Sequence, residues 1–230
     1  IQSQSAEYLA AFFGAGADRL DDPPFSHRPR FRATAQAKLF YSEDLRARLK
    51  GYDATAALAA TLPERFARWH PLHQAQYLET TLLLPGYILS SQGDRVSMAN
   101  AVEGRFPFLD HRLVEFAARI PTAMKLRGLD EKHILKSAAA GLVPRTISSR
   151  SKQPYRAPDS ESFRDAAYVG EALATQTGLF SPAAVAKLAA KARSGAMTGF
   201  RDNAAFVGIL STQLWHSQFV ARSTSLIDAA

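Results

Sequence analysis

Apolar side chains recur along the chain at three- and four-residue spacing, which is the pattern of amphipathic helices. Proline, glycine and N-capping residues separate these stretches and mark where each helix begins and ends. We expect helices over 1–20, 43–50, 64–69, 72–104, 111–120, 131–140, 182–193 and 203–219. Residues 21–29 hold two adjacent prolines and are predicted to form a loop. No run of alternating strand residues and no internal repeat is present, so the pattern predicts a mainly helical protein.

Range 72–104 is the longest helical stretch, and we expect a break near Pro85-Gly86 and an end near Glu103-Gly104. Glu103 would then lie at a helix C-terminus, where the helix dipole disfavours a carboxylate. An acid in that position needs a cation, a hydrogen-bond donor or a chemical role. An ion pair with Arg105 or Arg95 and a part in chemistry are both open at this point.

Three aspartates precede helical stretches and are predicted to cap them: Asp110, Asp130 and Asp202. The helix after Asp110 is expected to turn Leu113, Ala117 and Ile120 inward and to end at Pro121. The helix after Asp130 is expected to bury Ile134, Leu135, Ala138 and Ala139.

Composition narrows the class of protein. The 230 residues include no cysteine, which excludes disulfides, thiolate metal sites and a cysteine nucleophile on this chain. The longest apolar run, Tyr8–Phe13, is far too short for a membrane span, and no signal peptide is visible. We therefore expect a cytoplasmic protein without a membrane partner. The first residue is Ile1 rather than Met, which suggests a piece of a longer protein.

Cations outnumber acids, 28 to 21, and some of them gather in segment 145–156. This segment holds Arg145, Arg150, Lys152 and Arg156 and no acid. Arginine forks and a lysine point charge suit phosphate or pyrophosphate. A solvated basic loop is the alternative. A nucleic-acid partner is not expected, because Tyr155 is the only aromatic residue there.

Several short segments, in order, resemble the synthetase domain of glutamine-dependent asparagine synthetases. They are Leu82–Tyr87, Gly93–Ala99, Val102–Arg112, Lys125–Leu129, Glu131–Lys136 and Arg150–Asp159, with a looser fit over Gly199–Leu214. The resemblance is dense over 72–165 and thin over 1–70. It implies an α/β adenine-nucleotide hydrolase-like (PP-loop) domain. The family's Ser-Gly-Gly-x-Asp-Ser loop, its Gly-Glu-Gly-x-Asp-Glu segment and its N-terminal cysteine do not occur in this sequence.

We therefore expect the mainly α, C-terminal part of that domain, without the parallel-sheet half that carries the ATP loop. The whole of 1–230 would be a partial synthetase domain. Its parts would be a helical lead-in (1–71), a motif-bearing core (72–165) and C-terminal helices (166–230).

The resemblance also implies the chemistry. The complete enzyme adenylates the aspartate side chain with ATP and Mg²⁺, and ammonia from glutamine then forms the amide. Glu103 matches the glutamate that orients or deprotonates the attacking nitrogen. Lys152 matches the lysine that contacts the α-phosphate and pyrophosphate, with Arg150 and Arg156 assisting.

Upstream glutaminase and ATP-loop segments would be partners, with ATP and Mg²⁺ held mainly there. The isolated chain is predicted to be inactive, no metal site is assigned to it, and a homodimer is left open. Two alternatives are kept. One is a related ligase acting on another acid, of the β-lactam synthetase or lasso-cyclase type. The other is a helical interaction or nucleic-acid-binding module without catalysis.

Overall fold

The computed structural model describes residues 22–128, 130–150, 159–163, 166–197 and 200–221. The chain divides into two compact units. Unit 1 contains described residues 28–57 and 159–221, and unit 2 contains described residues 22–27 and 58–150, within the gaps just given. Helix α4 (Ala54–Thr61) has residues in both. The helix expected over 1–20 lies outside the described residues.

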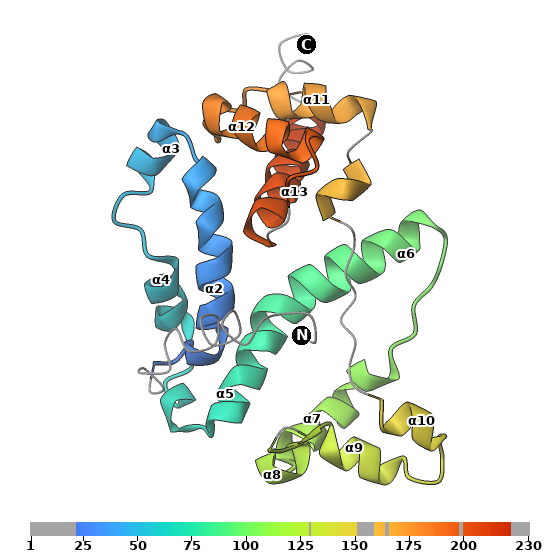
Figure 1. Ribbon diagram of the computed structural model, residues 1–230. Helices are drawn as coiled ribbons and strands as arrows, with labels where there is room; N and C mark the ends of the chain where they lie inside the picture. The colour runs from blue at the N-terminus through green and yellow to red at the C-terminus, as the bar shows by residue number, and fades with distance from the viewer. Residues whose placement is uncertain (1–21, 129, 151–158, 164–165, 198–199, 222–230) are drawn as a thin grey trace, which may run out of the picture. The chain divides into compact units, whose positions relative to one another are not determined.

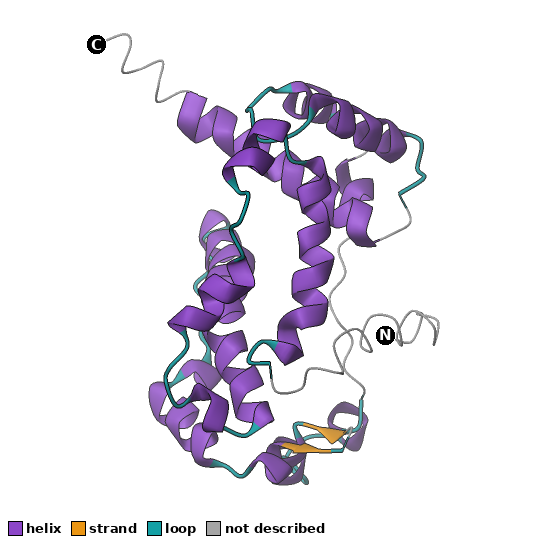
Figure 2. Ribbon diagram, turned by 90° about the vertical axis from the view of Figure 1, so that its left-hand side faces the viewer, coloured by secondary structure: helices purple, strands orange, loops and turns teal. Residues whose placement is uncertain are grey.

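The prediction of a mainly helical protein is confirmed. One small antiparallel hairpin accompanies the helices, formed by β1 (Leu126–Arg127) and β2 (Asp130–Glu131) and visible as the orange arrows of Figure 2. Two residues per strand are too few to produce an alternating pattern, so the sequence did not reveal it. No helix among the described residues has the length and apolar character required to cross a bilayer.

Unit 1 is held together by one hydrophobic core. Its helices are α2 (Arg28–Ala35), α3 (Glu43–Arg48), α11 (Ala167–Ala174), α12 (Pro182–Arg193) and α13 (Phe200–Trp215), with 3₁₀ turns at Gln36–Phe40 and Asp159–Phe163 and a π turn at His216–Ala221. Figure 1 shows α11, α12 and α13 packed together in orange and red. Each contributes side chains at helical spacing to a single buried cluster. The cluster is Val169, Ala172, Leu173, Val185, Leu188, Ala189, Ala205, Phe206, Ile209 and Leu210.

Helix starts in unit 1 are partly as expected. Ser42 caps α3 by accepting from the Leu45 N–H at 3.1 Å, and Ser181 caps α12. Asp202 does not cap α13, because that helix begins at Phe200 and Asp202 lies inside its first turn. The buried Asp202 carboxylate instead accepts from the side chains of Lys191 and Arg201, so an ion pair replaced the expected cap.

Unit 2 contains one long continuous helical stretch over 71–99, formed by α5, a π-helix and α6, and several short helices (Figure 1). The helical elements are 3₁₀ turns at Phe25–His27, Phe66–Arg68 and Pro107–Leu109, α5 (Pro71–Leu78), a π-helix (Glu79–Asp94), α6 (Arg95–Ala99), α7 (His111–Arg119), α8 (Thr122–Lys125), α9 (His133–Ala138) and α10 (Arg145–Ser148).

The loop predicted over 21–29 is wrong beyond Pro24. Helix α2 starts at Arg28, because a proline at position 29 is tolerated in a first helical turn.

The helix break expected at Pro85-Gly86 is also wrong. A π-helix runs through both residues, and at its end the Arg95 N–H donates to Ser90 O, five residues back. In an α-helix the proline ring collides with the carbonyl four residues earlier. The wider π turn relieves that collision, so the helix continues.

Caps and inward faces in unit 2 differ from expectation in two places. Asp110 caps α7 as predicted, accepting from the Arg112 N–H at 2.9 Å. Asp130 lies in β2 rather than at a cap, and its carboxylate binds the side chains of His133 and Lys136. None of the residues predicted to turn inward is buried: Leu113 is 40% accessible and Leu135 is 45% accessible. Those of intermediate burial are Ala117, Ile120, Ile134 and Ala139. Few side chains in this unit are buried, so these helices have little to pack against.

A small aromatic cluster forms the packed part of unit 2. The Phe66 ring is buried, and its centroid lies 5.4 Å from that of Trp69 and 5.7 Å from that of Tyr77. Leu78, at the end of α5, is fully buried. The short helix predicted between the two prolines at 63 and 71 is present at Phe66–Arg68, because Phe66 anchors it.

Candidate functional site

The segment that carries the Val-Glu-Gly-Arg motif leaves α6 through a C-terminal turn with two backbone hydrogen bonds. The Val102 N–H donates to Ser97 O at 2.8 Å and the Ala101 N–H donates to Met98 O at 3.2 Å. This is the Schellman pattern, which requires a left-handed residue, and Ala101 supplies it with φ of 55°. The helix therefore ends at Ala99, and Glu103 is not in its last turn as the sequence had suggested.

Glu103 forms an exposed ion pair with Arg105. The distance from Arg105 Nη2 to Glu103 Oε1 is 2.9 Å, and the two side chains are 81% and 73% accessible. This is one of the two pairings that the sequence left open for Glu103. A surface pair of this kind contributes only about 0–1 kcal/mol to stability. The carboxylate is thus loosely held and able to meet a ligand.

Gly104 lies under the ring of Phe106. A Cβ at position 104 would stand 2.5 Å from Phe106 Cζ, closer than real Cβ contacts allow. The ring is half-exposed, at 48%, and precedes Pro107, which favours extended backbone at the residue before it. Glycine at 104 therefore lets the aromatic side chain fold back between Glu103 and the prolyl turn.

A hollow of about 520 Å³ lies beside this segment in unit 2. One wall is the end of the π-helix, with Gly93 at a close approach: a Cβ there would be 3.3 Å from Ile88 O. The other wall is the motif segment. The lining residues are Ile88, Leu89, Gln92, Gly93, Arg105, Phe106, Pro107, Phe108 and Leu109. Its volume is in the range of small-molecule sites, about 300–1,000 Å³.

The basic segment begins on α10 and is exposed there. Arg145 opens the helix, and Arg150 follows its end. Within the part of the chain that the structure describes, neither guanidinium is paired with a carboxylate. Lys152 and Arg156 lie outside the described residues, so their distances from Glu103 are not part of this structure. The charge that remains at Arg145 and Arg150 is available to an anion.

One polar contact in unit 2 was not foreseen. The Lys125 ammonium lies 3.3 Å from His73 Nε2, 3.4 Å from Gln76 Oε1 and 3.4 Å from Ala118 O. Burial lowers the pKa of Lys125, and burial followed by the charge of Lys125 lowers the pKa of His73. Lys125 and His73 are 52 positions apart, and no local sequence signal links them.

The structure offers no ready metal centre in its described ranges. No group of three or more His, Asp, Glu or Cys side chains there could hold a metal ion. His70 and His73 come close in sequence, but the His70 ring accepts from the Leu72 N–H at 3.1 Å and acts as a helix cap.

Comparison with known proteins places the chain in a family. The asparagine synthase family description matches residues 9–217, and the chain belongs to that family. No solved structure matches the chain significantly.

Three relatives show the range of similarity. A putative glutamine-hydrolysing asparagine synthetase of Mycobacterium tuberculosis is 30% identical over 204 residues, covering 84% of this chain and 30% of the relative. Asparagine synthetase 3 of Bacillus subtilis is 46% identical over 67 residues, 29% of this chain and 11% of the relative. The amidase chyE of Penicillium rubens is 44% identical over 97 residues, 40% of this chain and 14% of the relative. The chain thus spans less than a third of the length of each of these relatives.

Proposed function

We propose that this chain is part of a glutamine-hydrolysing asparagine synthase. The complete enzyme would use ATP to adenylate the aspartate side-chain carboxylate and release pyrophosphate. Ammonia would then attack the acyl carbon, and AMP would leave with the electron pair of the broken C–O bond. The observation that carries the proposal is the exposed Glu103 carboxylate, whose ion-pair partner Arg105 lines an apolar hollow, in a chain of this family.

Glu103 is proposed as the group that orients the attacking nitrogen and accepts its proton. Its partner Arg105 lines the hollow, so the pair stands where a bound substrate would meet it. A positioned general base contributes roughly 10²–10⁴-fold to such a step. Arg105 would hold the Glu103 carboxylate by its ion pair until the nitrogen arrives.

Lys152 is proposed to bind the α-phosphate and pyrophosphate, with Arg150 and Arg156 beside it. Charge accumulates on the phosphate oxygens as the anhydride bond breaks, and fixed cations stabilise it. The unpaired guanidinium of Arg150, two residues from Lys152, supports this assignment within the described residues.

Mg²⁺ is expected with ATP, but the described residues do not fit it. They contain no group of three or more candidate ligands. We assign no Mg²⁺ ligand to this chain and route no step through the ion.

The chain is further proposed to work as part of a larger domain. Unit 2 exposes many large apolar side chains, among them Met98 at 70%, Phe108 at 68% and Leu142 at 82%. Large apolar side chains exposed in such number are typical of a surface that packs against further protein. The division into a lead-in, a motif-bearing core and C-terminal helices stays a proposal.

The test uses the full-length protein and two assays. ATP–pyrophosphate exchange with aspartate reports adenylation, and asparagine formation from ammonia reports the second step. Lys152→Ala should reduce exchange strongly. Glu103→Gln should leave exchange largely intact and slow amide formation by about 10²–10⁴-fold.

Glu115→Gln, an exposed glutamate on α7 outside the hollow, is the matched control and should change neither assay. An unchanged exchange rate in Lys152→Ala would reject the anion role. If the Glu103→Gln variant forms asparagine at the normal rate, Glu103 is not the general base.

A second candidate is an amide ligase that acts on another acid. The similarity to a protein named as an amidase, at higher identity than the longest asparagine synthetase match, favours keeping it. Exchange assays with a panel of carboxylic acids separate the two. A rate with another acid well above that with aspartate would favour this candidate.

A further inference from the structure

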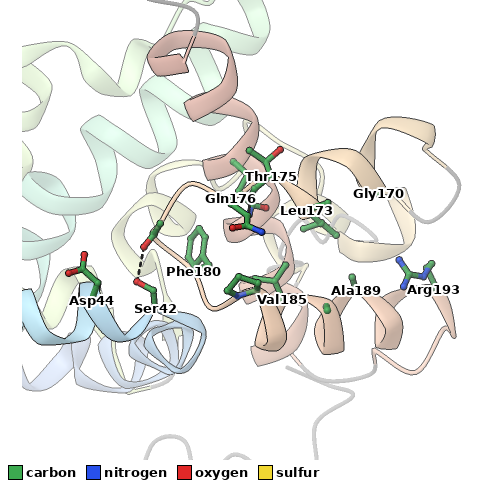
Figure 3. A pocket seen from close by; sticks show the side chains of 15 residues that line it. Ser42, Asp44, Gly170, Leu173, Thr175, Gln176, Phe180, Val185, Ala189 and Arg193 are labelled. Atoms are coloured by element: carbon green, nitrogen blue, oxygen red, sulfur yellow. Dashed lines mark hydrogen bonds between the residues drawn. The ribbon is translucent and has the colours of Figure 1, made fainter. Parts of the chain in front are cut away.

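Unit 1 contains a second cavity, far along the sequence from the Glu103 motif. It has a volume of about 530 Å³ and lies among α3, α11, α12, α13 and the loop 175–180. Figure 3 shows its walls, with Leu173, Val185 and Ala189 between Asp44 and Arg193. These three apolar residues belong to the buried core of the unit, so the floor of the cavity is the surface of the core itself.

The loop that closes the cavity is fixed at both ends. The buried Gln213 donates through Nε2 to Thr175 O at 2.8 Å. Ser42 donates through Oγ to Gly178 O at 2.7 Å, the dashed line of Figure 3, and its N–H donates to Leu179 O at 2.9 Å. The Ser181 N–H donates to Phe40 O at 2.8 Å. A wall held by four hydrogen bonds gives a cavity that exists before any ligand binds, which reduces the entropy lost on binding.

The polar groups at the rim differ in their availability. Asp44 is already paired with Arg48, at 2.9 Å between Oδ2 and Nε. Arg193, in the last turn of α12, has no ion pair and no side-chain hydrogen bond within the described parts of the chain, and the same holds for the Gln176 amide. Among the described residues, the cavity therefore offers one unneutralised cation, the free Gln176 amide and the unpaired Oε1 of Gln213 above an apolar floor. This combination favours a ligand that has one negatively charged group and an apolar remainder.

We propose that this cavity binds a small amphipathic carboxylate, with its carboxylate on Arg193 and its hydrocarbon part against Leu173, Val185 and Ala189. The guanidinium fork matches a carboxylate in geometry as well as charge. The volume falls in the usual range for small ligands, about 300–1,000 Å³. The lining of this cavity includes none of the proposed catalytic residues, and the proposal does not depend on their roles.

The test measures binding of 3-phenylpropionate and hexanoate to the full-length protein by calorimetry and by backbone amide shifts in NMR. The neutral amides of the same acids are the ligand controls. Binding of the acids is expected, with shifts confined to residues that line the cavity or adjoin it, near 42–44, over 170–193 and near 213. The amides should bind at least tenfold more weakly, since a charge-assisted hydrogen bond is lost.

Two pairs of variants on α12 sharpen the result. Arg193→Gln should weaken acid binding about tenfold or more, and Lys187→Gln, which removes an exposed charge outside the cavity, should not. Ala186→Phe fills the cavity from its exposed rim and should abolish binding, whereas Ala190→Phe, on the same helix but outside the cavity, should not. No binding by the folded wild type, equal binding of acids and amides, or equal effects within either pair would overturn the proposal.

Discussion

At the scale of single residues, one backbone angle decides where α6 ends and the Val-Glu-Gly-Arg segment begins. Ala101 holds a left-handed conformation, φ 55°, and thereby ends α6 before Glu103. An L-residue in this region is strained by about 1–2 kcal/mol, while glycine is not. The left-handed angle persists because the two turn hydrogen bonds donated by the N–H groups of residues 101 and 102 form only with it.

Ala101→Gly should therefore raise the free energy of unfolding by about 1 kcal/mol, since relief of strain exceeds the added entropy of the unfolded chain. Urea unfolding measures it. Ala99→Gly, at a right-handed helical position two residues earlier, should lower stability by about 1 kcal/mol. If both glycines destabilise equally, Ala101 is not strained.

Asp202 shows a second residue-scale effect, a buried carboxylate held between two cations. Hydrogen bonds from Lys191 first, and from Arg201, lower its pKa in the folded protein. The folded state therefore binds this proton less readily than the unfolded state. Its stabilisation is complete above the unfolded pKa of about 3.9 and is lost as the pH falls through the lower folded pKa.

Asp202→Asn should lower the free energy of unfolding by about 1–2 kcal/mol at pH 7. The difference from the wild type should shrink as the pH falls below about 4. Unfolding curves between pH 7 and pH 3 measure it. Asp44→Asn, which breaks an exposed pair with Arg48, should change stability by less than about 1 kcal/mol. A gap between Asp202→Asn and the wild type that is constant with pH would contradict the ion-pair account.

At the scale of elements, the π-helix Glu79–Asp94 is the least ordinary part of the molecule. It carries Pro85 in its interior and supplies one wall of the hollow that Arg105 also lines. Since an α-helix would clash with the proline ring, the wide turn and the proline belong together. The pitch of this helix then decides which side chains face the hollow.

Pro85→Ala should allow α-helical hydrogen bonds between residues four apart and raise the free energy of unfolding by about 1–3 kcal/mol. Nuclear Overhauser contacts between residues four apart should replace contacts five apart over 79–94. Gly86→Ala is the control, because a Cβ there meets nothing within 4 Å. Gly86→Ala should raise the free energy of unfolding by at most about 1 kcal/mol and leave the contacts between residues five apart unchanged. A π pattern that survives Pro85→Ala would show that the surrounding sequence, not the proline, sets the turn.

At the scale of the whole molecule, the two units differ in how well they bury their apolar residues. Unit 1 has a connected core, whereas the apolar face of α7 in unit 2 is open, with Phe116 63% accessible. An amphipathic helix is normally stabilised by packing that face. Unit 2 would thus be stabilised more than unit 1 by further protein that buries its exposed apolar side chains.

The isolated 230-residue chain should show no ATP–pyrophosphate exchange, because its sequence lacks the family's Ser-Gly-Gly-x-Asp-Ser loop. The full-length protein should show exchange with its own acid substrate. A hydrophobic dye should also bind the isolated chain more strongly per mole than the full-length protein, because the face of α7 is open. Robust exchange by the isolated chain would contradict the proposal that it carries only part of a site.

Much of the local structure was predictable, because its causes are local. Ser42, Asp110 and Ser181 cap the helices that they precede, and Gly195 takes the left-handed angle just after α12. The motif around Glu103 was visible as well, since family segments are read along the chain. Its ion pair with Arg105 spans two residues and was one of the pairings left open.

The sequence by itself determined the helical class, the family and the starts of α3, α5, α7 and α12. The tertiary structure decided which groups meet. Asp202 looked like a cap, but Lys191 on a neighbouring helix made it an ion pair. Lys125 and His73, the cavity floor at Leu173 and Val185, and the exposure of α7 depend on packing between distant segments. Local periodicity records which residues share a helix face, but only the packing of helices against each other fixes what that face touches.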